Sequence, residues 1–279
     1  MQSLSKSVAL CLLSMAAFGT TKVSIDKALK DRMIKAEVIC KGGLNVNYKI
    51  KNETRDSLKI IIPAGWRMNS VQEEYQDILV TREEVLALRK GEQKNFDVKG
   101  YCCEADHSGP IKGAKYELGK MADLKLQLLA NYMNTHRMDQ NTEQYAVWAV
   151  SDNEPSANIT SANDSLSVAL RNFVAVIKDE PIPWYTLQKR VKITTDGNIY
   201  ENPLNLKAKV DYKVDKECYA YFFVLDASGK KVGQIQGQWI YPGTNEYAMN
   251  VNLKDFKKGK YKVVLATKDQ EFINKEFEI

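Results

Sequence analysis

The first half of the chain carries the hydrophobic pattern of short β-strands. Residues 44–51 alternate strictly between apolar and polar side chains, and this period of two predicts a half-buried strand. A polar turn separates them from a second predicted strand at 58–62, so we expect the two strands to pair as a hairpin. Further strands are predicted at 77–81, 85–88 and 95–98. Several short strands at this spacing predict a sandwich-like sheet.

Helical patterns lie on both sides of these strands. Residues 25–35 have helical spacing, and so do residues 118–133. In the second segment Met121, Leu124, Leu128 and Tyr132 fall on one face, which Leu126 and Leu129 widen. Residues 141–150 form another apolar run, and a polar loop over 151–165 leads into a further predicted helix at 166–178.

The pattern becomes purely strand and turn after a proline-containing connector. Pro181 and Pro183 hold the backbone extended over residues 179–185. Strands are predicted beyond it at 206–212, 219–225, 249–253, 261–265 and 272–279. The sequence therefore predicts an α+β chain: a β-sandwich-like domain with packed helices over residues 20–180, then an all-β sandwich over residues 190–279.

The N-terminus has the pattern of an export signal over residues 1–19. Lys6 precedes an apolar stretch from Val8 to Phe18, and small residues stand at Ala17 and Gly19. The stretch is too short to span a bilayer, and no later segment resembles a membrane helix. A buried first helix is the alternative. We expect cleavage near Gly19 and a protein that is secreted or held at the cell surface, with the periplasm as another destination.

Composition narrows the class of partner. A hydrophobic content of 44% and a charged content of 27% are typical of a folded soluble protein. The net charge is +5, and the lysines that contribute to it are scattered along the chain. They are not clustered as in a nucleic-acid-binding surface. Loss of the signal would leave Cys40, Cys102, Cys103 and Cys218 in an oxidising compartment that permits disulfides.

Two short segments carry the candidate chemistry. They are Tyr101-Cys102-Cys103-Glu104 and Glu143-Gln144-Tyr145-Ala146-Val147-Trp148. A cysteine thiolate that attacks a glutamine carboxamide expels ammonia and forms an internal thioester, provided that rigid neighbours hold the two groups in contact. The rings of Tyr101, Tyr145 and Trp148 would shield this acyl donor from water. Glu143 is expected to raise the pKa of the cysteine and to disfavour the thiolate.

Residues 22–150 resemble the thioester domains of surface adhesins. Tyr101-Cys102-Cys103-Glu104 matches their aromatic-Cys-aliphatic-acid motif, with Cys103 in the aliphatic place. The second segment matches their Thr-Gln-x-Ala-aliphatic-Trp motif, except that Glu143 replaces the threonine. The interval between Cys102 and Gln144 is shorter than such adhesins usually have. The resemblance implies that a partner's lysine amine displaces the sulfur and leaves a covalent amide.

The last ninety or so residues resemble the immunoglobulin-like module of flagellar hook-capping proteins and the sorting domains of type IX secretion cargo. The residues that carry this resemblance lie at 224–232, 258–263 and 275–279. It implies an immunoglobulin-like sandwich that acts as a spacer or engages the secretion machinery. A passive structural module is the alternative.

Inert arrangements of the same residues remain open. Cys102 or Cys103 would form a disulfide with Cys40, Gln144 would make ordinary hydrogen bonds at a strand, and Tyr145 and Trp148 would fill the core. A zinc site from His107 and the cysteine pair has poor ligand spacing. We therefore expect an adhesion or binding protein without cofactor or metal, whose partner is a protein or glycan at a cell surface.

Conventional catalysis has little support. The chain has no G-x-S-x-G, phosphate-binding glycine loop or HExxH, and no acidic residue stands in an apolar context that would suggest a tuned acid–base pair. We do not expect an enzyme, and a secreted hydrolase is the less favoured alternative.

Overall fold

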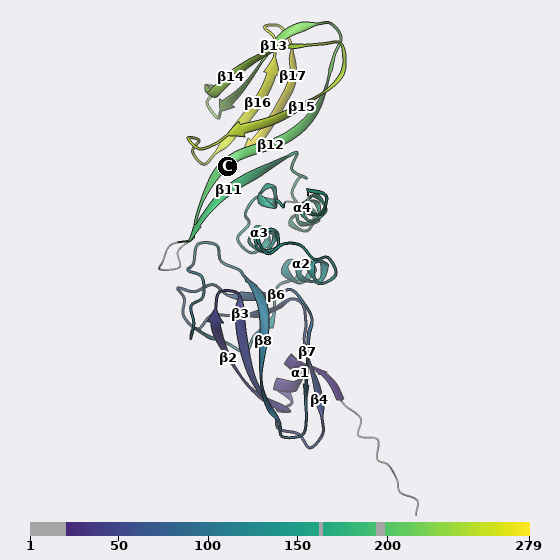
Figure 1. Ribbon diagram of the computed structural model, residues 1–279, viewed down its shortest axis with the longest axis vertical. Coiled ribbons are helices and arrows are strands. Elements are labelled where there is room, and N and C mark those ends of the chain that lie inside the picture. The colour runs from purple at the N-terminus through teal and green to yellow at the C-terminus, as the bar shows by residue number, and fades with distance from the viewer. Residues whose placement is uncertain (1–20, 162–163, 194–198) are drawn as a thin grey trace, which may run out of the picture.

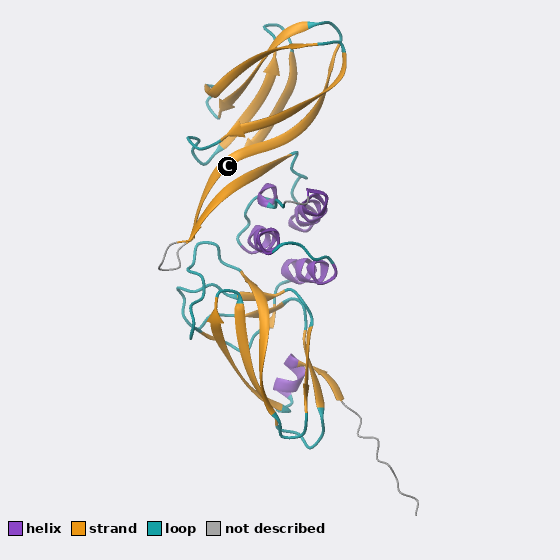
Figure 2. Cartoon of the chain, in the orientation of Figure 1, coloured by secondary structure: helices purple, strands orange, loops and turns teal. Residues whose placement is uncertain are grey.

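The computed structural model describes residues 21–161, 164–193 and 199–279. The molecule is elongated: N-terminal sheets lie at one end, a layer of helices in the middle and C-terminal sheets at the other end (Figure 1). Strands make up both ends of the described chain, and helices are gathered mainly in the middle layer (Figure 2). The predicted signal peptide at 1–19 lies outside the described residues.

Two sheets form the N-terminal end and share one hydrophobic core. The first has the order β1 (Thr21–Ser24), β4 (Leu58–Ile62), β7 (Glu84–Leu88), with β1 parallel to β4. The second has the order β10 (Lys120–Met121), β5 (Trp66–Met68), β6 (Ile78–Val80), β8 (Gln93–Cys102), β3 (Asn45–Asn52), β2 (Ile34–Gly42), β9 (Lys115–Tyr116). The short helix α1 (Ile25–Lys30) joins β1 to β2.

The alternation at 44–51 is confirmed, because β3 buries Val46, Tyr48 and Ile50. The predicted hairpin with β4 is wrong. Strand β3 pairs with β2 and β8, whereas β4 belongs to the other sheet. Asn52 explains the crossing, since its buried amide donates hydrogen bonds to Asp56 O at 2.8 Å and Arg89 O at 2.9 Å and holds the chain where it leaves one sheet for the other.

Three helices pack against each other next to these sheets: α2 (Leu124–Thr135), α3 (Gln140–Ser151) and α4 (Asp164–Lys178). The predicted face of the first was wrong, because Leu124 and Leu128 are 69% and 43% exposed. The helix begins only after its cap at Asp123, and its buried face carries Leu126, Leu129, Ala130 and Met133. The short 3₁₀ turn η1 (Ser156–Asn158) follows α3.

The C-terminal end consists of two antiparallel sheets around a common core. One has the order β11 (Tyr185–Ile193), β12 (Ile199–Val214), β15 (Gly243–Asn252). The other has the order β14 (Lys231–Ile240), β13 (Cys218–Asp226), β16 (Lys260–Ala266), β17 (Glu271–Glu278). Strand β14 escaped prediction, because its glycines and glutamines interrupt the apolar alternation.

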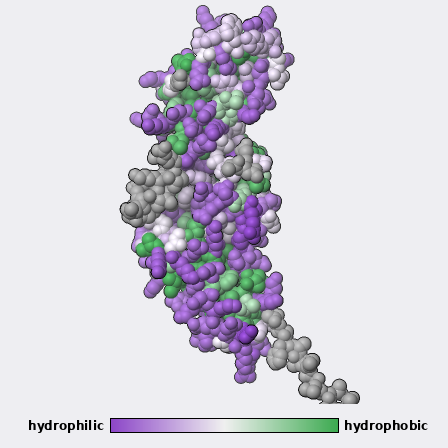
Figure 3. Space-filling model, in the orientation of Figure 1, coloured by the Kyte–Doolittle hydropathy of each residue, from purple (hydrophilic) through white to green (hydrophobic). Residues whose placement is uncertain are grey.

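The visible surface is mainly hydrophilic, with separate apolar patches over both ends of the molecule (Figure 3). Within the described ranges, no helix combines the length and the hydropathy needed to cross a membrane.

Candidate functional site

The six predicted site residues lie on two elements that pack against each other. Tyr101 and Cys102 end strand β8, and the other four stand on helix α3, which the sequence pattern left as an unassigned apolar run. The helix begins where Asp139 caps it by accepting from Thr142 N at 3.0 Å. Thr142 Oγ1 donates to the same carboxylate at 2.6 Å, which fixes the first turn.

The side chain of Gln144 lies against the main chain of Cys102. Cys102 N donates to Gln144 Oε1 at 3.1 Å, and Gln144 Nε2 donates to Cys102 O at 2.7 Å. Both polar atoms of the carboxamide are therefore engaged, and its orientation relative to Cys102 is fixed. The inert alternative, in which Gln144 makes ordinary hydrogen bonds at a strand, agrees with this contact, although the glutamine itself stands on a helix.

Glu143 lies in a buried polar cluster beside this contact. Only 2% of it is exposed, and Tyr101 Oη donates to its Oε2 at 2.5 Å. Arg82 pairs with Oε1 of the same carboxylate, which also accepts from Met138 N at 3.0 Å. The sequence patterns did not indicate that this carboxylate is buried.

The expected influence of Glu143 on the thiol is also corrected. Burial is the main cause that raises the pKa of Cys102, to about 12, and the charges of Glu104 and Cys40 add to it. The carboxylate of Glu143 instead forms an ion pair with Arg82 and accepts a hydrogen bond from Tyr101. Glu104 faces Arg67, with which it forms an ion pair.

The cysteines are not joined to each other. Cys40, Cys102, Cys103 and Cys218 are all free thiols, so the expected alternative of a disulfide to Cys40 is wrong for this structure. The Cys40 thiol makes a local hydrogen bond, in which its Sγ accepts from Gly42 N at 3.2 Å. Cys103 is completely buried, and burial raises the pKa of its thiol well above the usual value.

Aromatic residues stand on the same two elements as the contact. The rings of Tyr145 and Trp148 meet edge to face with centroids 5.9 Å apart. Trp148 is buried, and its indole Nε1 donates to Gln76 Oε1 at 3.4 Å. Tyr101 and Cys102 are each 5% exposed, whereas Gln144 is half-buried. Water therefore has access mainly from the side of the carboxamide.

Several supporting residues escaped the sequence patterns. Asp139 had a readable signal, because an aspartate just before a helix is a preferred cap. No sequence signal indicated Arg82 or Gln76, since they lie 61 and 72 positions away from their partners Glu143 and Trp148. Ser151 donates to Cys103 O and further ties the end of α3 to the chain after β8. In the described part of the chain, no three His, Cys, Asp or Glu side chains gather where they could hold a metal ion.

The comparisons with known proteins add little. No family model matches the chain, and no curated protein matches it. Among solved structures, a β-glucosidase from Kluyveromyces marxianus is similar with a TM-score of 0.21 at 12% identity, over 84% of this chain and 44% of that one. A score this low carries no argument about fold or activity.

Proposed function

We propose that the protein is a secreted or surface-exposed adhesion protein that captures partner amines through a thioester between Cys102 and Gln144. The observation that carries the proposal is the paired hydrogen bonding of the Gln144 carboxamide with the Cys102 main chain, at 3.1 and 2.7 Å. This contact holds the electrophilic carbon beside the residue that bears the thiol. Held geometry of this kind replaces much of the entropy that two free groups would lose.

The reaction balances without a co-reactant. Cys102 Sγ bonds to the Gln144 carboxamide carbon, the C–N bond breaks, and the thiol proton leaves with the nitrogen as ammonia. A primary amine then attacks the same carbon, an amide forms, and the sulfur leaves as the thiol. Burial that raises the pKa of Cys102 to about 12 slows the first step, but the thioester product is neutral and carries no such penalty.

The surroundings suit storage of an acyl donor. The rings of Tyr145 and Trp148 exclude water from one side, and Tyr101 is held by Glu143 on another. The partial exposure of Gln144 leaves a route by which the amine of a partner reaches the carbon. The thioester-domain resemblance of residues 22–150 and the expected export agree with a role at a cell surface.

The C-terminal residues complete the proposal. Two antiparallel sheets with a shared core support the finer assignment of an immunoglobulin-like sandwich over 190–279, which would act as a spacer or engage the secretion machinery. The division into domains at 20–180 and 190–279 belongs to the same proposal, as does the sandwich-like arrangement of the N-terminal sheets.

Mass spectrometry of the intact, reduced mature protein tests the thioester. We expect the loss of one ammonia and an adduct with methylamine. Both should vanish in Cys102→Ala and Gln144→Ala. Two matched controls should keep both signals: Cys103→Ala changes the adjacent cysteine, and Gln140→Ala changes an exposed glutamine on the same helix. An unmodified mass without methylamine addition would refute covalent capture.

A non-covalent binding module is the second candidate. It is favoured by exposed rings on β13, β14 and the following turn, where Tyr219, Tyr221, Trp239 and Tyr241 are 42–59% exposed. Tyr219 contacts Tyr221 and Trp239 with centroids 5.3 and 5.5 Å apart. Adjacent exposed rings suit a glycan or protein surface. Glycan-array binding that survives Cys102→Ala and disappears in Trp239→Ala would support this candidate over the first.

A further inference from the structure

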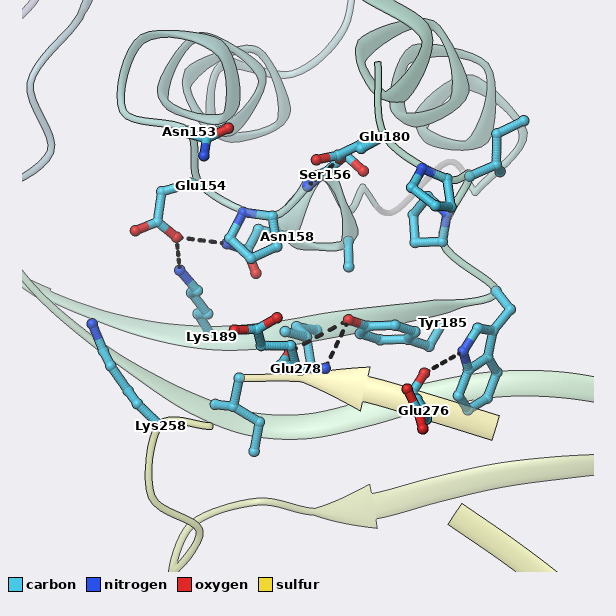
Figure 4. A pocket seen from close by; sticks show the side chains of 18 of the residues that line it. Asn153, Glu154, Ser156, Asn158, Glu180, Tyr185, Lys189, Lys258, Glu276 and Glu278 are labelled. Atoms are coloured by element: carbon cyan, nitrogen blue, oxygen red, sulfur yellow. Dashed lines mark hydrogen bonds and ion pairs between the residues drawn. The ribbon is translucent and has the colours of Figure 1, made fainter. Parts of the chain in front are cut away.

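A cavity of about 800 Å³ lies between the helical layer and the C-terminal sheets. Its upper wall in Figure 4 is the segment after α3, including η1, and its lower wall is formed by β11 and the end of β17. Its size is that of a small-molecule site. Neither Cys102 nor Gln144 lines it, so it is separate from the proposed thioester.

Two buried polar atoms in this wall have no hydrogen-bond partner. Asn158 is 2% exposed, and its Nδ2 donates to Glu154 Oε2 at 3.0 Å, while its Oδ1 is unsatisfied. Figure 4 shows this oxygen directed away from the helices into the cavity. Ser156 is 1% exposed, and its Oγ is also unsatisfied. An unsatisfied buried acceptor is costly, and a ligand that donates to it removes that cost.

Negative charge prevails around the cavity. Its lining includes five carboxylates and two lysines: Asp106, Glu154, Glu180, Glu276 and Glu278, with Lys189 and Lys258. Glu154 is compensated by Lys189 at 3.1 Å and Glu180 by Lys178 at 2.9 Å. Glu278 forms no ion pair with any side chain that the structure describes. The lining therefore carries more negative than positive side chains, which favours a cationic over an anionic ligand.

An apolar wall stands next to these acceptors. The rings of Trp184 and Tyr185 meet edge to face with centroids 5.2 Å apart. Trp184 Nε1 donates a hydrogen bond to Glu276 O at 2.7 Å. The ring faces suit an alkyl chain, and they attract a cation above them. Leu187 and Ile279 extend the same wall.

We propose that this cavity binds a ligand with a primary alkylammonium group. The ammonium donates to Asn158 Oδ1 and is neutralised by Glu278, while its alkyl chain lies along Trp184 and Tyr185. Two sources share this chemistry, namely a free diamine and a lysine side chain of a peptide. The binding is non-covalent and reversible, and it does not depend on the thioester.

Calorimetric titration of the full mature chain with two probes tests the site. The probes are 1,5-diaminopentane and an acetylated, amidated Gly-Lys-Gly peptide, and their uncharged analogues are 1-pentanol and the norleucine peptide. We expect binding of at least one charged probe and none of either analogue. Preference for the diamine or the peptide identifies the source. No binding by either charged probe, or equal binding by the analogues, would overturn the proposal.

Variants assign the binding to the cavity. Glu278→Gln should weaken it about tenfold or more, since it removes a charged hydrogen-bond partner. Glu271→Gln, on the same strand outside the cavity, should not weaken it. Lys258→Gln removes a competing cation and should tighten binding a few-fold, unlike Lys254→Gln. Glu278 and Lys258 are exposed, so these changes leave the fold intact. Equal affinities across the four variants would refute the site, and unchanged affinity in Cys102→Ala separates this result from that of the thioester.

Discussion

Tyr101 Oη donates a 2.5 Å hydrogen bond to Glu143 Oε2, one residue before the contact between Cys102 and Gln144. Strand β8 and helix α3 are thus joined at two successive positions, first by side chains alone and then by a side chain and the main chain. The first contact fixes the register of the second, because a rotation of α3 would break both.

We expect Glu143→Ala to destabilise the fold by about 3–5 kcal/mol, since it leaves Arg82 without its buried counter-ion. Urea denaturation measures the loss. Gln140→Ala on the same helix is the control and should change stability little, because Gln140 is exposed. A double-mutant cycle of Tyr101→Phe with Glu143→Gln should show coupling, and simple additivity would contradict the paired role of these residues.

The sequence predicts strands best where one face is buried. The alternation in β3 survives because Val46, Tyr48 and Ile50 face a single core. The sequence pattern does not predict which strand pairs with β3, because the choice between β4 and β8 depends on where Asn52 turns the chain. The pattern also assigns the wrong buried face to α2, because the helix begins after Asp123 and this boundary determines which residues face inwards.

Asp139→Ala should cost about 1–2 kcal/mol, since the side chain caps α3 and also accepts from Ser161 Oγ at 2.9 Å. The helix would then begin later, and Gln144 lies just beyond its first turn. We therefore expect less thioester in this variant, measured as a larger share of unmodified mass. Asp139→Asn, which retains an acceptor, should recover most of the stability. A fully modified Asp139→Ala protein would show that the cap does not position Gln144.

Two glycines form a matched pair for a steric prediction. Gly119 and Gly113 have φ values of +95° and +93°, so alanine is strained at both. A Cβ at Gly119 would lie 2.3 Å from Trp66 Nε1, whereas nothing lies within 4 Å at Gly113. That indole donates to Tyr48 Oη at 3.0 Å inside the core. Gly119→Ala should therefore cost about 1–3 kcal/mol more than Gly113→Ala in urea denaturation. Equal losses would mean that Trp66 moves freely.

The candidate site was partly readable from the sequence. Short motifs selected Cys102 and Gln144, and the structure brings the Gln144 side chain to the main chain of Cys102; the thioester between them stays a prediction. The role of Glu143 could not be predicted, since its ion pair is with Arg82 and its hydrogen bond is with Tyr101, both distant in the sequence. The effect of the Glu143 carboxylate on the nearby Cys102 thiol depends on the three-dimensional placement of its partners Arg82 and Tyr101.

Stability should fall in alkaline solution because Cys103 is buried. Burial raises the pKa of its thiol well above 9.0, the ordinary value, although Arg67 opposes this rise. The unfolded chain loses the proton near the ordinary pKa while the folded chain keeps it, so the unfolded state binds fewer protons and stability falls as pH rises. The loss begins near pH 9 and reaches about 1.4 kcal/mol per pH unit from this one group.

Urea denaturation of wild type and Cys103→Ala between pH 7 and about pH 11 isolates this contribution, in the range where a thiol titrates. Buried tyrosines add their own loss to both proteins, because burial also raises the pKa of Tyr48 and Tyr116. The difference between the two proteins should therefore shrink as pH rises, whatever the tyrosines contribute. A pH-independent difference for Cys103→Ala would mean that the folded protein ionises this thiol as readily as the unfolded chain does.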